Sequence, residues 1–306
     1  MNVLSIGLTH RSPGRALGVI VLGLAVSLFS AGFASPPGAT PVSPVIAMAE
    51  VSCGLRPCLS GPGVSAPGVD VDCLPTADRP TPVILIHGTR ADKTINWSYL
   101  GPELADLGYC VYSVDLPDRG QAPIAESVAA LATRVEEVMA STGARRVSLF
   151  GHSLGGIVAR DYVKRGGGLH VVDDLIAMGT PHFGYYTEPP GDQVDAAVNT
   201  ECPACWEQAS GSEYMNALNV GDLTPGSISY TSIITARDQM ALPLSSQYLP
   251  ENGRVANILL QEACPDHQVD HLMLAFDSLV RDWVVNALDR QGPADGDRSV
   301  DCEPAP

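Results

Sequence analysis

The chain has 306 residues, of which 45% are hydrophobic, and its formal net charge at pH 7 is −16. This length accommodates one sizeable α/β domain or two small ones, and the hydrophobic content excludes an intrinsically disordered protein. A net negative charge repels polyanions, and the chain has no basic run. We therefore expect no nucleic acid among its partners.

The first 34 residues are typical of a secretory signal peptide. Arg11 and Arg15 precede an uncharged apolar run, Ala16–Phe29, which small residues and prolines follow. This run is short for a transmembrane anchor, which is the alternative interpretation. Cleavage after Ala34 fits best, with residues 47–49 as a second possible site. The sequence therefore predicts a secreted protein.

All eight cysteines follow this segment, and an even number in an exported chain predicts disulfides. Their pairing cannot be read from the sequence. Cys202 and Cys205 have the spacing of a redox motif, but they lie in a loop-rich stretch, and no second cysteine or histidine pair indicates a bound metal. The eight positions are Cys53, Cys58, Cys73, Cys110, Cys202, Cys205, Cys264 and Cys302.

Strand and helix patterns alternate between residues 82 and 290, after a Pro/Gly-rich lead-in at 35–81 that the cysteines would tie down. This alternation predicts a single α/β domain with a mostly parallel central sheet and helices on both faces. Predicted strands cover Pro82–Gly88, Tyr109–Pro117, Arg145–Phe150, Val171–Thr180, Ser227–Asp238 and Arg254–Gln261. Predicted helices cover Asn96–Gly108, Ala122–Gly143, Leu154–Arg165 and His271–Asp289. Residues 183–226 have no strong period and form an insertion, and 291–306 form a C-terminal tail.

The pentapeptide GHSLG, Gly151–Gly155, lies between a predicted strand and a predicted helix. A strand–turn–helix context around G-x-S-x-G is typical of a nucleophile elbow, in which a sharp turn exposes the serine hydroxyl. A chance Gly-Ser turn is the plainer alternative. We expect Ser153 to be a nucleophile, which requires a general base and an acid that orients it.

The chain order of such sites places an acid and then a histidine after the serine. Asp238 follows the penultimate predicted strand, although an aspartate there could simply cap a turn. His271 and His267 both follow the last strand, and we favour His271 because it opens the closing helix. The other two histidines that follow Ser153 fit less well, since one precedes a strand and the other has no strand-end acid before it; they are His170 and His182.

Two backbone N–H groups should stabilise the oxyanion that forms when Ser153 attacks a carbonyl. One belongs to Leu154, at the start of the helix after the elbow. The other comes from the loop after the first strand, where Thr89 is the candidate and Gly88 permits close approach. Because these donors are backbone groups, we expect Thr89→Pro to be more harmful than Thr89→Ala.

The stretches VILIHGT, VSLFGHSLGGIVAR, GTPHFG and YTSIITARDQMALP, together with Cys205–Gly226, resemble the secreted bacterial class 2 lipases of the α/β-hydrolase fold over about residues 80–290. The resemblance implies that Ser153, His271 and Asp238 are nucleophile, base and acid, with Thr89 and Leu154 as oxyanion donors. It also implies hydrolysis of carboxylic esters, often acylglycerols, without a cofactor. The small members have GH directly after the last strand, where this chain has ACPDHQVDH, so His267 stays an alternative base.

By the same resemblance, residues 183–226 would cross the mouth of the site. Phe183–Tyr186 and Trp206 would then line an acyl groove or belong to a lid, unless this stretch is only a surface loop held by its cysteines. We expect a monomeric enzyme that acts on lipid or other acyl esters and contacts a lipid interface transiently. Three alternatives stay open: an acyltransferase with the same triad, a peptidase, and an inactive binding protein with a hydrolase fold.

Overall fold

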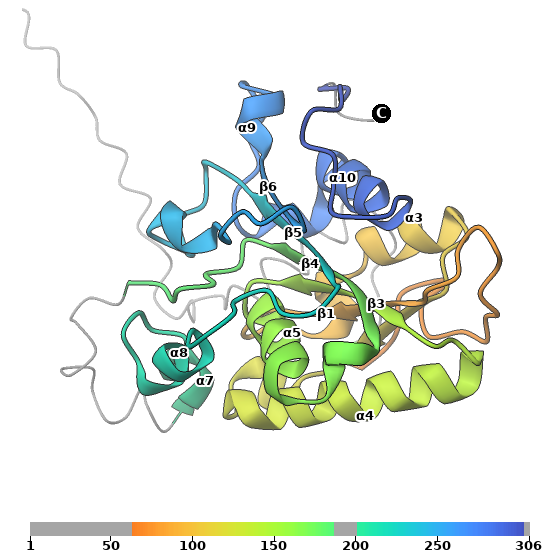
Figure 1. The fold of residues 1–306 in the computed structure, drawn as a ribbon, viewed down its shortest axis with the longest axis horizontal. Coiled ribbons are helices and arrows are strands. Elements are labelled where there is room, and N and C mark those ends of the chain that lie inside the picture. Colours follow the sequence, from red (N-terminus) through yellow and green to blue (C-terminus); the bar gives the residue numbers. More distant parts are fainter. Residues whose placement is uncertain (1–62, 187–200, 303–306) are drawn as a thin grey trace, which may run out of the picture. The chain divides into compact units, whose positions relative to one another are not determined.

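The computed structural model describes residues 63–186 and 201–302, and within them six strands form one fully parallel sheet (Figure 1). The strand order is β2-β1-β3-β4-β5-β6. Each strand falls inside or next to a predicted one: β1 Val83–Ile86, β2 Val111–Val114, β3 Val147–His152, β4 Val172–Met178, β5 Ser229–Ile234 and β6 Val255–Leu259. The predicted α/β class, with a parallel central sheet and helices packed on it, is confirmed.

The order of the strands reverses at β1. From β1 the chain crosses to β2 on one side, and it then returns to β3 on the other side, so that Val83 pairs with both Val111 and Ser148. In open α/β sheets the crevice at such a reversal, beyond the carboxyl ends of the strands, is where ligands bind. Gly88 follows β1 and Ser153 follows β3, so both lie at this crevice.

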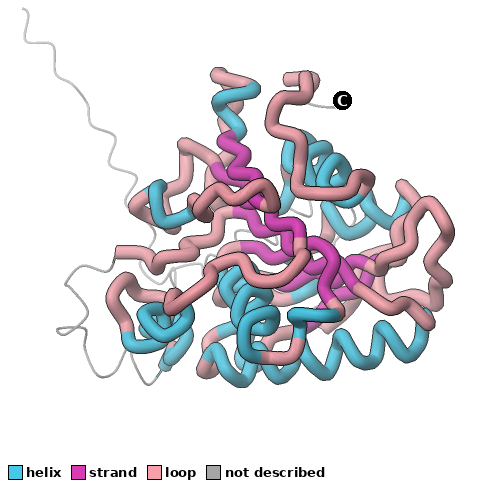
Figure 2. The backbone as a smooth tube through the Cα atoms, in the orientation of Figure 1, coloured by secondary structure: helices cyan, strands magenta, loops and turns pink. Residues whose placement is uncertain are grey.

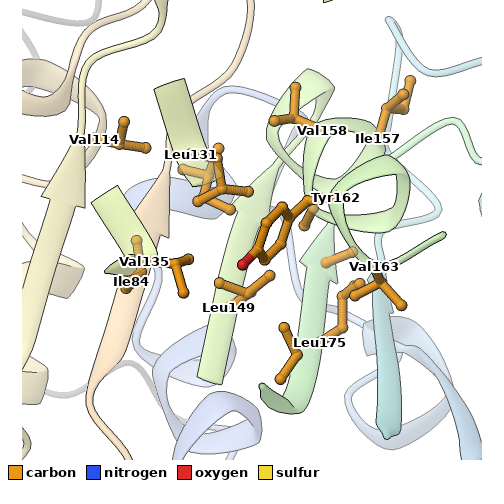
Figure 3. Close-up of a cluster of buried hydrophobic side chains, with 14 of the residues drawn as sticks. Ile84, Val114, Leu131, Val135, Leu149, Ile157, Val158, Tyr162, Val163 and Leu175 are labelled. Atoms are coloured by element: carbon orange, nitrogen blue, oxygen red, sulfur yellow. The ribbon is translucent and has the colours of Figure 1, made fainter. Parts of the chain in front are cut away.

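Helices cover both faces of the sheet (Figures 1 and 2). On one face lie α4 (Ile124–Thr142) and α5 (Leu154–Arg165), whose apolar side chains pack on Ile84 and Leu149 (Figure 3). On the other face lie α3 (Leu100–Asp106) and α10 (Ser278–Leu288), which pack with Leu85 and Phe150. Because both faces are covered, strands β1 to β5 are buried along almost their whole length, which explains their largely apolar sequences.

Helix α4 ends where the sequence predicts. Gly143 adopts the left-handed conformation, with φ of 71°, and its N–H donates to the carbonyl of Met139. Glycine takes this conformation without the strain that a β-carbon would cause, so it is the residue that terminates the helix.

The closing helix begins later than predicted. The prediction of a helix from His271 is wrong, because α10 begins only at Ser278, after a short 3₁₀ turn, η5 (Met273–Phe276). Asp277 has an extended backbone, with φ of −107° and ψ of 129°, and its side chain accepts a hydrogen bond from the N–H of Val280. This N-cap ends the 3₁₀ turn and starts the helix. His271 therefore lies in a loop, where its position is set by tertiary contacts.

The predicted insertion holds two short helices, α7 (Pro203–Glu207) and α8 (Glu213–Leu218). Each begins at a side-chain cap, Cys202 for α7 and Ser212 for α8. Both helices are too short to produce a recognisable period in the sequence. The remaining short elements are α2 (Lys93–Asn96), η1 (Pro117–Gly120), η2 (Gly168–His170), η4 (Leu244–Gln247) and α9 (Leu260–Ala263).

Three disulfides confirm the prediction of paired cysteines: Cys73–Cys110, Cys202–Cys205 and Cys264–Cys302. Cys53 and Cys58 lie outside the described residues, as do the predicted signal peptide and most of the predicted lead-in. Within the described ranges, no helix has the length and apolar character needed to cross a bilayer.

Candidate active site

Ser153 occupies a strained turn between β3 and α5. Its φ of 54° and ψ of −118° lie outside the conformations that non-glycine residues normally adopt. The turn is held from both sides, because the Ser153 N–H donates to the carbonyl of Met178 at 2.9 Å and its carbonyl accepts from the Thr180 hydroxyl at 3.0 Å. Backbone strain of this kind is stored at functional sites when the surrounding structure enforces it.

The glycines around Ser153 are required by close packing. A β-carbon on Gly155 would lie 2.1 Å from the carbonyl oxygen of Ile86, and one on Gly151 would lie 2.4 Å from the backbone of Gly155. Any side chain at either position would push α5 away from β1 and open the turn. The motif G-x-S-x-G therefore reflects the tight contact of strand, turn and helix that the sequence predicts.

His271 and Asp238 form a buried pair. The imidazole Nδ1 lies 2.8 Å from Asp238 Oδ2, and the two side chains are 3% and 0% exposed. The second carboxylate oxygen accepts from the backbone N–H groups of Met240 and Ala241, each at 2.8 Å. Gln247 donates to Oδ2 at 3.0 Å. Every lone-pair direction of the carboxylate is thus engaged by a donor.

These donors determine the charge of Asp238. Burial favours the neutral acid, but the hydrogen bond and charge of His271, together with the two backbone donors, outweigh it, and the pKa of Asp238 is lowered. The carboxylate is therefore ionised at neutral pH and accepts from Nδ1–H of His271. This tautomer leaves Nε2 of the imidazole able to accept a proton.

Ser153 and His271 line one cavity of about 290 Å³, with Gly88 and Thr89 on its wall. Most of the other lining groups are apolar: Ala91, Pro181, Tyr185, Met240, Ala241 and Leu272. A mostly apolar cavity with a few convergent polar groups is typical of a small-molecule site. Ser153, His271 and the loop after β1 are thus gathered around a single cavity, with Asp238 hydrogen-bonded to His271.

The two predicted oxyanion donors belong to residues close to Ser153 in the chain or on its cavity wall: Leu154 directly follows Ser153, and Thr89 lines the same cavity. Leu154 is the first residue of α5, and the first N–H groups of a helix have no partner inside the helix. Thr89 lies in a turn that is closed by a hydrogen bond from the Ala91 N–H to the Gly88 carbonyl at 3.3 Å. The Arg90 N–H donates to the Arg119 carbonyl at 2.7 Å, which connects this turn to η1. Gly88 lies close to the elbow, since a β-carbon on it would be 3.2 Å from that of Ser153.

His152 and Asn96 belong to the site and were not predicted from the sequence. His152 Nδ1 lies 3.0 Å from Asn96 Oδ1, and its Nε2 lies 3.1 Å from the carbonyl oxygen of His271. Asn96 Oδ1 also accepts from the Gly88 N–H at 3.3 Å. Burial, and then the nearby His271, lower the pKa of His152 to about 3, so its ring is neutral. These contacts connect the loop after β1 to the loop that carries His271.

His267, the alternative base, lies elsewhere. Its Nε2 is 2.9 Å from Asp277 Oδ2, and both residues line a different cavity, beside the Cys264–Cys302 disulfide. His182 is fully buried, and burial together with Arg160 lowers its pKa well below the usual value. The structure therefore brings His271, and not His267, to the cavity of Ser153.

Aromatic residues of the insertion also line two different cavities. Tyr185 lines the Ser153 cavity, and its hydroxyl donates to the carbonyl of Cys205 at 2.6 Å. Trp206 lines a different cavity, together with Tyr214. Of the aromatic residues predicted for an acyl groove, Tyr185 lines the Ser153 cavity, whereas Phe183, Tyr186 and Trp206 do not.

Comparison with known proteins agrees with the fold. The described part resembles the crystal structure of Aspergillus fumigatus lipase B, with a TM-score of 0.62 and 20% identity over 78% of this chain and 65% of that one. It also resembles the Bacillus licheniformis lipase BlEst2 in its propeptide form, with a TM-score of 0.57 and 18% identity over 79% of this chain and 57% of that one. At these identities the likeness concerns the fold alone, and it confirms the predicted α/β-hydrolase fold.

Sequence comparison defines the family. Residues 82–236 match the model of the palmitoyl protein thioesterase family, and the chain belongs to that family. An alignment of 116 positions is 37% identical to triacylglycerol lipases of Pseudarthrobacter phenanthrenivorans and Burkholderia plantarii. It covers 34% of this chain and about a third of the length of those relatives, 34% and 30%. The predicted relationship to lipases and esterases is confirmed.

Proposed function

We propose that the protein is a secreted serine hydrolase that cleaves carboxylic esters of lipids or other acyl compounds. The observation that carries the proposal is the joint position of Ser153 and His271 on one cavity, with Asp238 bound to the far nitrogen of the imidazole. A serine hydroxyl is a weak nucleophile by itself and needs such a base. The family and the named lipase relatives support the same chemistry.

In the proposed reaction, Ser153 Oγ attacks the ester carbonyl while His271 Nε2 takes its proton. The carbonyl oxygen becomes an oxyanion that accepts hydrogen bonds from the backbone N–H groups of Thr89 and Leu154. His271 then gives the proton to the leaving alcohol, and an acyl-enzyme remains. Water, activated by the same imidazole, releases the acid. Asp238 holds the tautomer of His271 and stabilises the imidazolium.

The apolar walls support an acyl group as the part of the substrate that is recognised. Met240, Ala241 and Leu272 line the cavity beside His271. Outside it, Tyr186 and Leu242 are exposed and are linked by a hydrogen bond from the Tyr186 N–H to the Leu242 carbonyl at 2.8 Å. Together with the half-exposed Met240, they provide an apolar rim that we propose contacts a lipid interface transiently.

The family favours thioesters as a second substrate class, because its model describes palmitoyl protein thioesterases. The proposed acyl-enzyme route serves either leaving group, a thiol or an alcohol. Rates on p-nitrophenyl esters of increasing acyl length, with and without an oil–water interface, and on palmitoyl-coenzyme A compare the two classes directly. An added acceptor alcohol that takes up the acyl group in preference to water would instead identify an acyltransferase.

Ser153→Ala tests the proposal. We expect turnover of p-nitrophenyl esters to fall by about 10⁵–10⁶-fold, since a triad without its nucleophile loses nearly all of its rate enhancement. A fluorophosphonate probe should label the wild-type enzyme and leave the variant unlabelled. Circular dichroism should show an unchanged fold. An active, correctly folded Ser153→Ala enzyme would overturn the proposal.

Export is the second part of the proposal. The disulfides Cys73–Cys110 and Cys264–Cys302 join distant parts of the chain, and bonds of this kind persist in oxidising compartments. The predicted signal peptide supplies the route. N-terminal sequencing of the protein recovered from a culture medium should begin at Ser35, and recovery of full-length protein only from the cytoplasm would contradict export.

A further inference from the structure

Gln208 touches the loop that provides an oxyanion donor. It directly follows α7, is 3% exposed and lies on the wall of the Ser153 cavity. Its Nε2 donates to Thr89 Oγ1 at 3.0 Å and to the carbonyl of Ala204 at 3.0 Å. The contact with Thr89 joins residues that are 119 positions apart in the sequence.

The direction of the bond to Thr89 is fixed by the contact with Ala204. A carbonyl oxygen can only accept, so the amide must present its nitrogen to Ala204. The same nitrogen faces Thr89, and the Thr89 hydroxyl therefore accepts from Gln208. The opposite amide orientation would place two acceptor oxygens against each other in a buried site, which is unfavourable.

A hydroxyl that accepts in this way still has its own proton to donate. Among the described residues, the one hydrogen bond of the Thr89 side chain is the bond it accepts from Gln208, and Thr89 lines the cavity that contains Ser153. Thr89 is also the residue whose backbone N–H is the second proposed oxyanion donor. The hydroxyl proton and this N–H are thus on one residue, on the wall of the cavity that contains Ser153.

The segment that carries Gln208 is held firmly. The Ala204 N–H donates to the Gln121 carbonyl at 3.1 Å, and the Glu207 carboxylate accepts from the Ile124 N–H at the start of α4 at 2.6 Å. The disulfide Cys202–Cys205 closes the first turn of α7. A donor held this rigidly can fix the orientation of the Thr89 hydroxyl before substrate arrives, as electrostatic stabilisation of a transition state requires.

We infer that Gln208 is a positioning residue that turns the Thr89 hydroxyl into a third donor to the oxyanion. The inference rests on the proposed function, since it concerns the charge that forms when Ser153 Oγ bonds to the carbonyl carbon and the carbonyl electron pair moves to oxygen. The Thr89 proton is shared with that oxygen in a hydrogen bond and is not transferred. Thr89 thereby acts through both its backbone N–H and its side chain.

Gln208→Glu is the sharpest test, because it keeps the shape and reverses the polarity. A carboxylate at position 208 accepts from the Thr89 hydroxyl and draws its proton away from the cavity. We expect kcat to fall by about 10–100-fold, somewhat less than the loss of a backbone oxyanion donor, while KM stays nearly constant. Affinity for an alkyl boronic acid, which forms a tetrahedral adduct on serine, should weaken by a similar factor.

Thr89→Val provides the matched background, since it removes the hydroxyl and keeps both the backbone N–H and the volume. Alone, it should reduce kcat about as much as Gln208→Glu. Combined with Gln208→Glu, it should cause little further loss, because Gln208 acts only through the hydroxyl. If Gln208→Glu does not fold, Gln208→Met serves instead, as it removes the donor without introducing a charge.

Asn252→Asp is the control, because Asn252 also donates an amide hydrogen to a threonine, Thr224, at 2.6 Å, but neither residue lines the Ser153 cavity. It should leave kcat unchanged. The inference is overturned if the Gln208 variants keep full kcat, or if their loss is equally large in the Thr89→Val background. Either result, together with an inactive Ser153→Ala enzyme, leaves the proposed function intact, whereas an active Ser153→Ala enzyme removes the proposed function itself.

Discussion

Both histidines that follow the last strand lie against an aspartate, at nearly the same distance. His271 lies 2.8 Å from Asp238, and His267 lies 2.9 Å from Asp277. The first pair is almost completely buried and shares a cavity with Ser153, whereas the second is about 15% exposed and lies next to a disulfide. A hydrogen bond to an aspartate therefore does not distinguish the two histidines, whereas the cavity that each one lines does.

The second aspartate has a different task. Asp277 Oδ1 accepts from the Val280 N–H at 3.0 Å and caps α10, while its other oxygen holds His267. In Asp238, by contrast, both oxygens accept hydrogen bonds, which come from His271, Gln247 and two backbone N–H groups. We interpret the first pair as the machinery of proton transfer and the second as a structural link between the loop before α10 and the helix itself.

Exchange of each histidine for alanine should separate the two pairs most clearly. His271→Ala removes the proposed base, and we expect kcat to fall by about 10⁵–10⁶-fold. His267→Ala should leave kcat close to that of the wild type. Initial rates with a p-nitrophenyl ester at pH 8 measure both effects. A large loss in His267→Ala at unchanged stability would return His267 to the role of base.

The aspartates should differ by a smaller factor. Asp238→Asn preserves shape but favours the wrong imidazole tautomer, and we expect a decrease in kcat of about 10⁴-fold. Asp277→Asn keeps a capping side chain, since asparagine and aspartate are comparable N-caps, and should leave kcat unchanged. Steady-state kinetics of both variants is the measurement. Equal losses in the two variants would show that the pairs are not functionally distinct.

A change near the second pair, His267 and Asp277, should lower the stability of the protein and not its activity. The disulfide Cys264–Cys302 closes a loop with a sequence separation of 38 next to His267. Replacing both cysteines by alanine should lower the free energy of unfolding by about 2–4 kcal/mol and leave kcat nearly unchanged. Urea unfolding together with an activity assay tests this. A selective loss of kcat without destabilisation would mean that this region contributes to catalysis.

Acid should affect the first region through His152, whose ring lies 5.1 Å from that of His271. The folded-state pKa of His152 is about 3, against 6.5 for an unperturbed histidine. Between these values the unfolded chain binds a proton at this position that the folded chain does not. The stability that the neutral ring provides is therefore complete above pH 6.5 and decreases as the pH falls, by about 1.4 kcal/mol per pH unit for this group.

Urea unfolding of the wild type and of His152→Gln at pH 7, 6 and 5 measures this contribution. The wild type should lose more stability than the variant between pH 6.5 and 5. Burial also lowers the pKa of His87 and His182, so a residual decrease in the variant is expected. Parallel pH profiles for the two proteins would contradict a neutral, buried His152 in the folded state.

Much of this fold is encoded locally. Continuous apolar runs predict the six strands, because strands covered on both faces have no polar side. Gly143 predicts the end of α4, and Gly151 and Gly155 predict the elbow around Ser153, because each position admits no β-carbon or favours the left-handed conformation. These signals can be recognised from neighbouring residues in the sequence, and the structure shows each of them where the sequence places it.

The long-range contacts were decided by tertiary structure. Neither composition nor spacing separates His271 from His267, and the prediction that His271 opens a helix is wrong. Gln208 shows no local signal either, because its role depends on Thr89, 119 positions away in the sequence. A local sequence pattern indicates which residues of a single element are buried and where the chain turns. Which side chains from different elements meet depends on how the sheet and its loops pack, and only the folded chain specifies that.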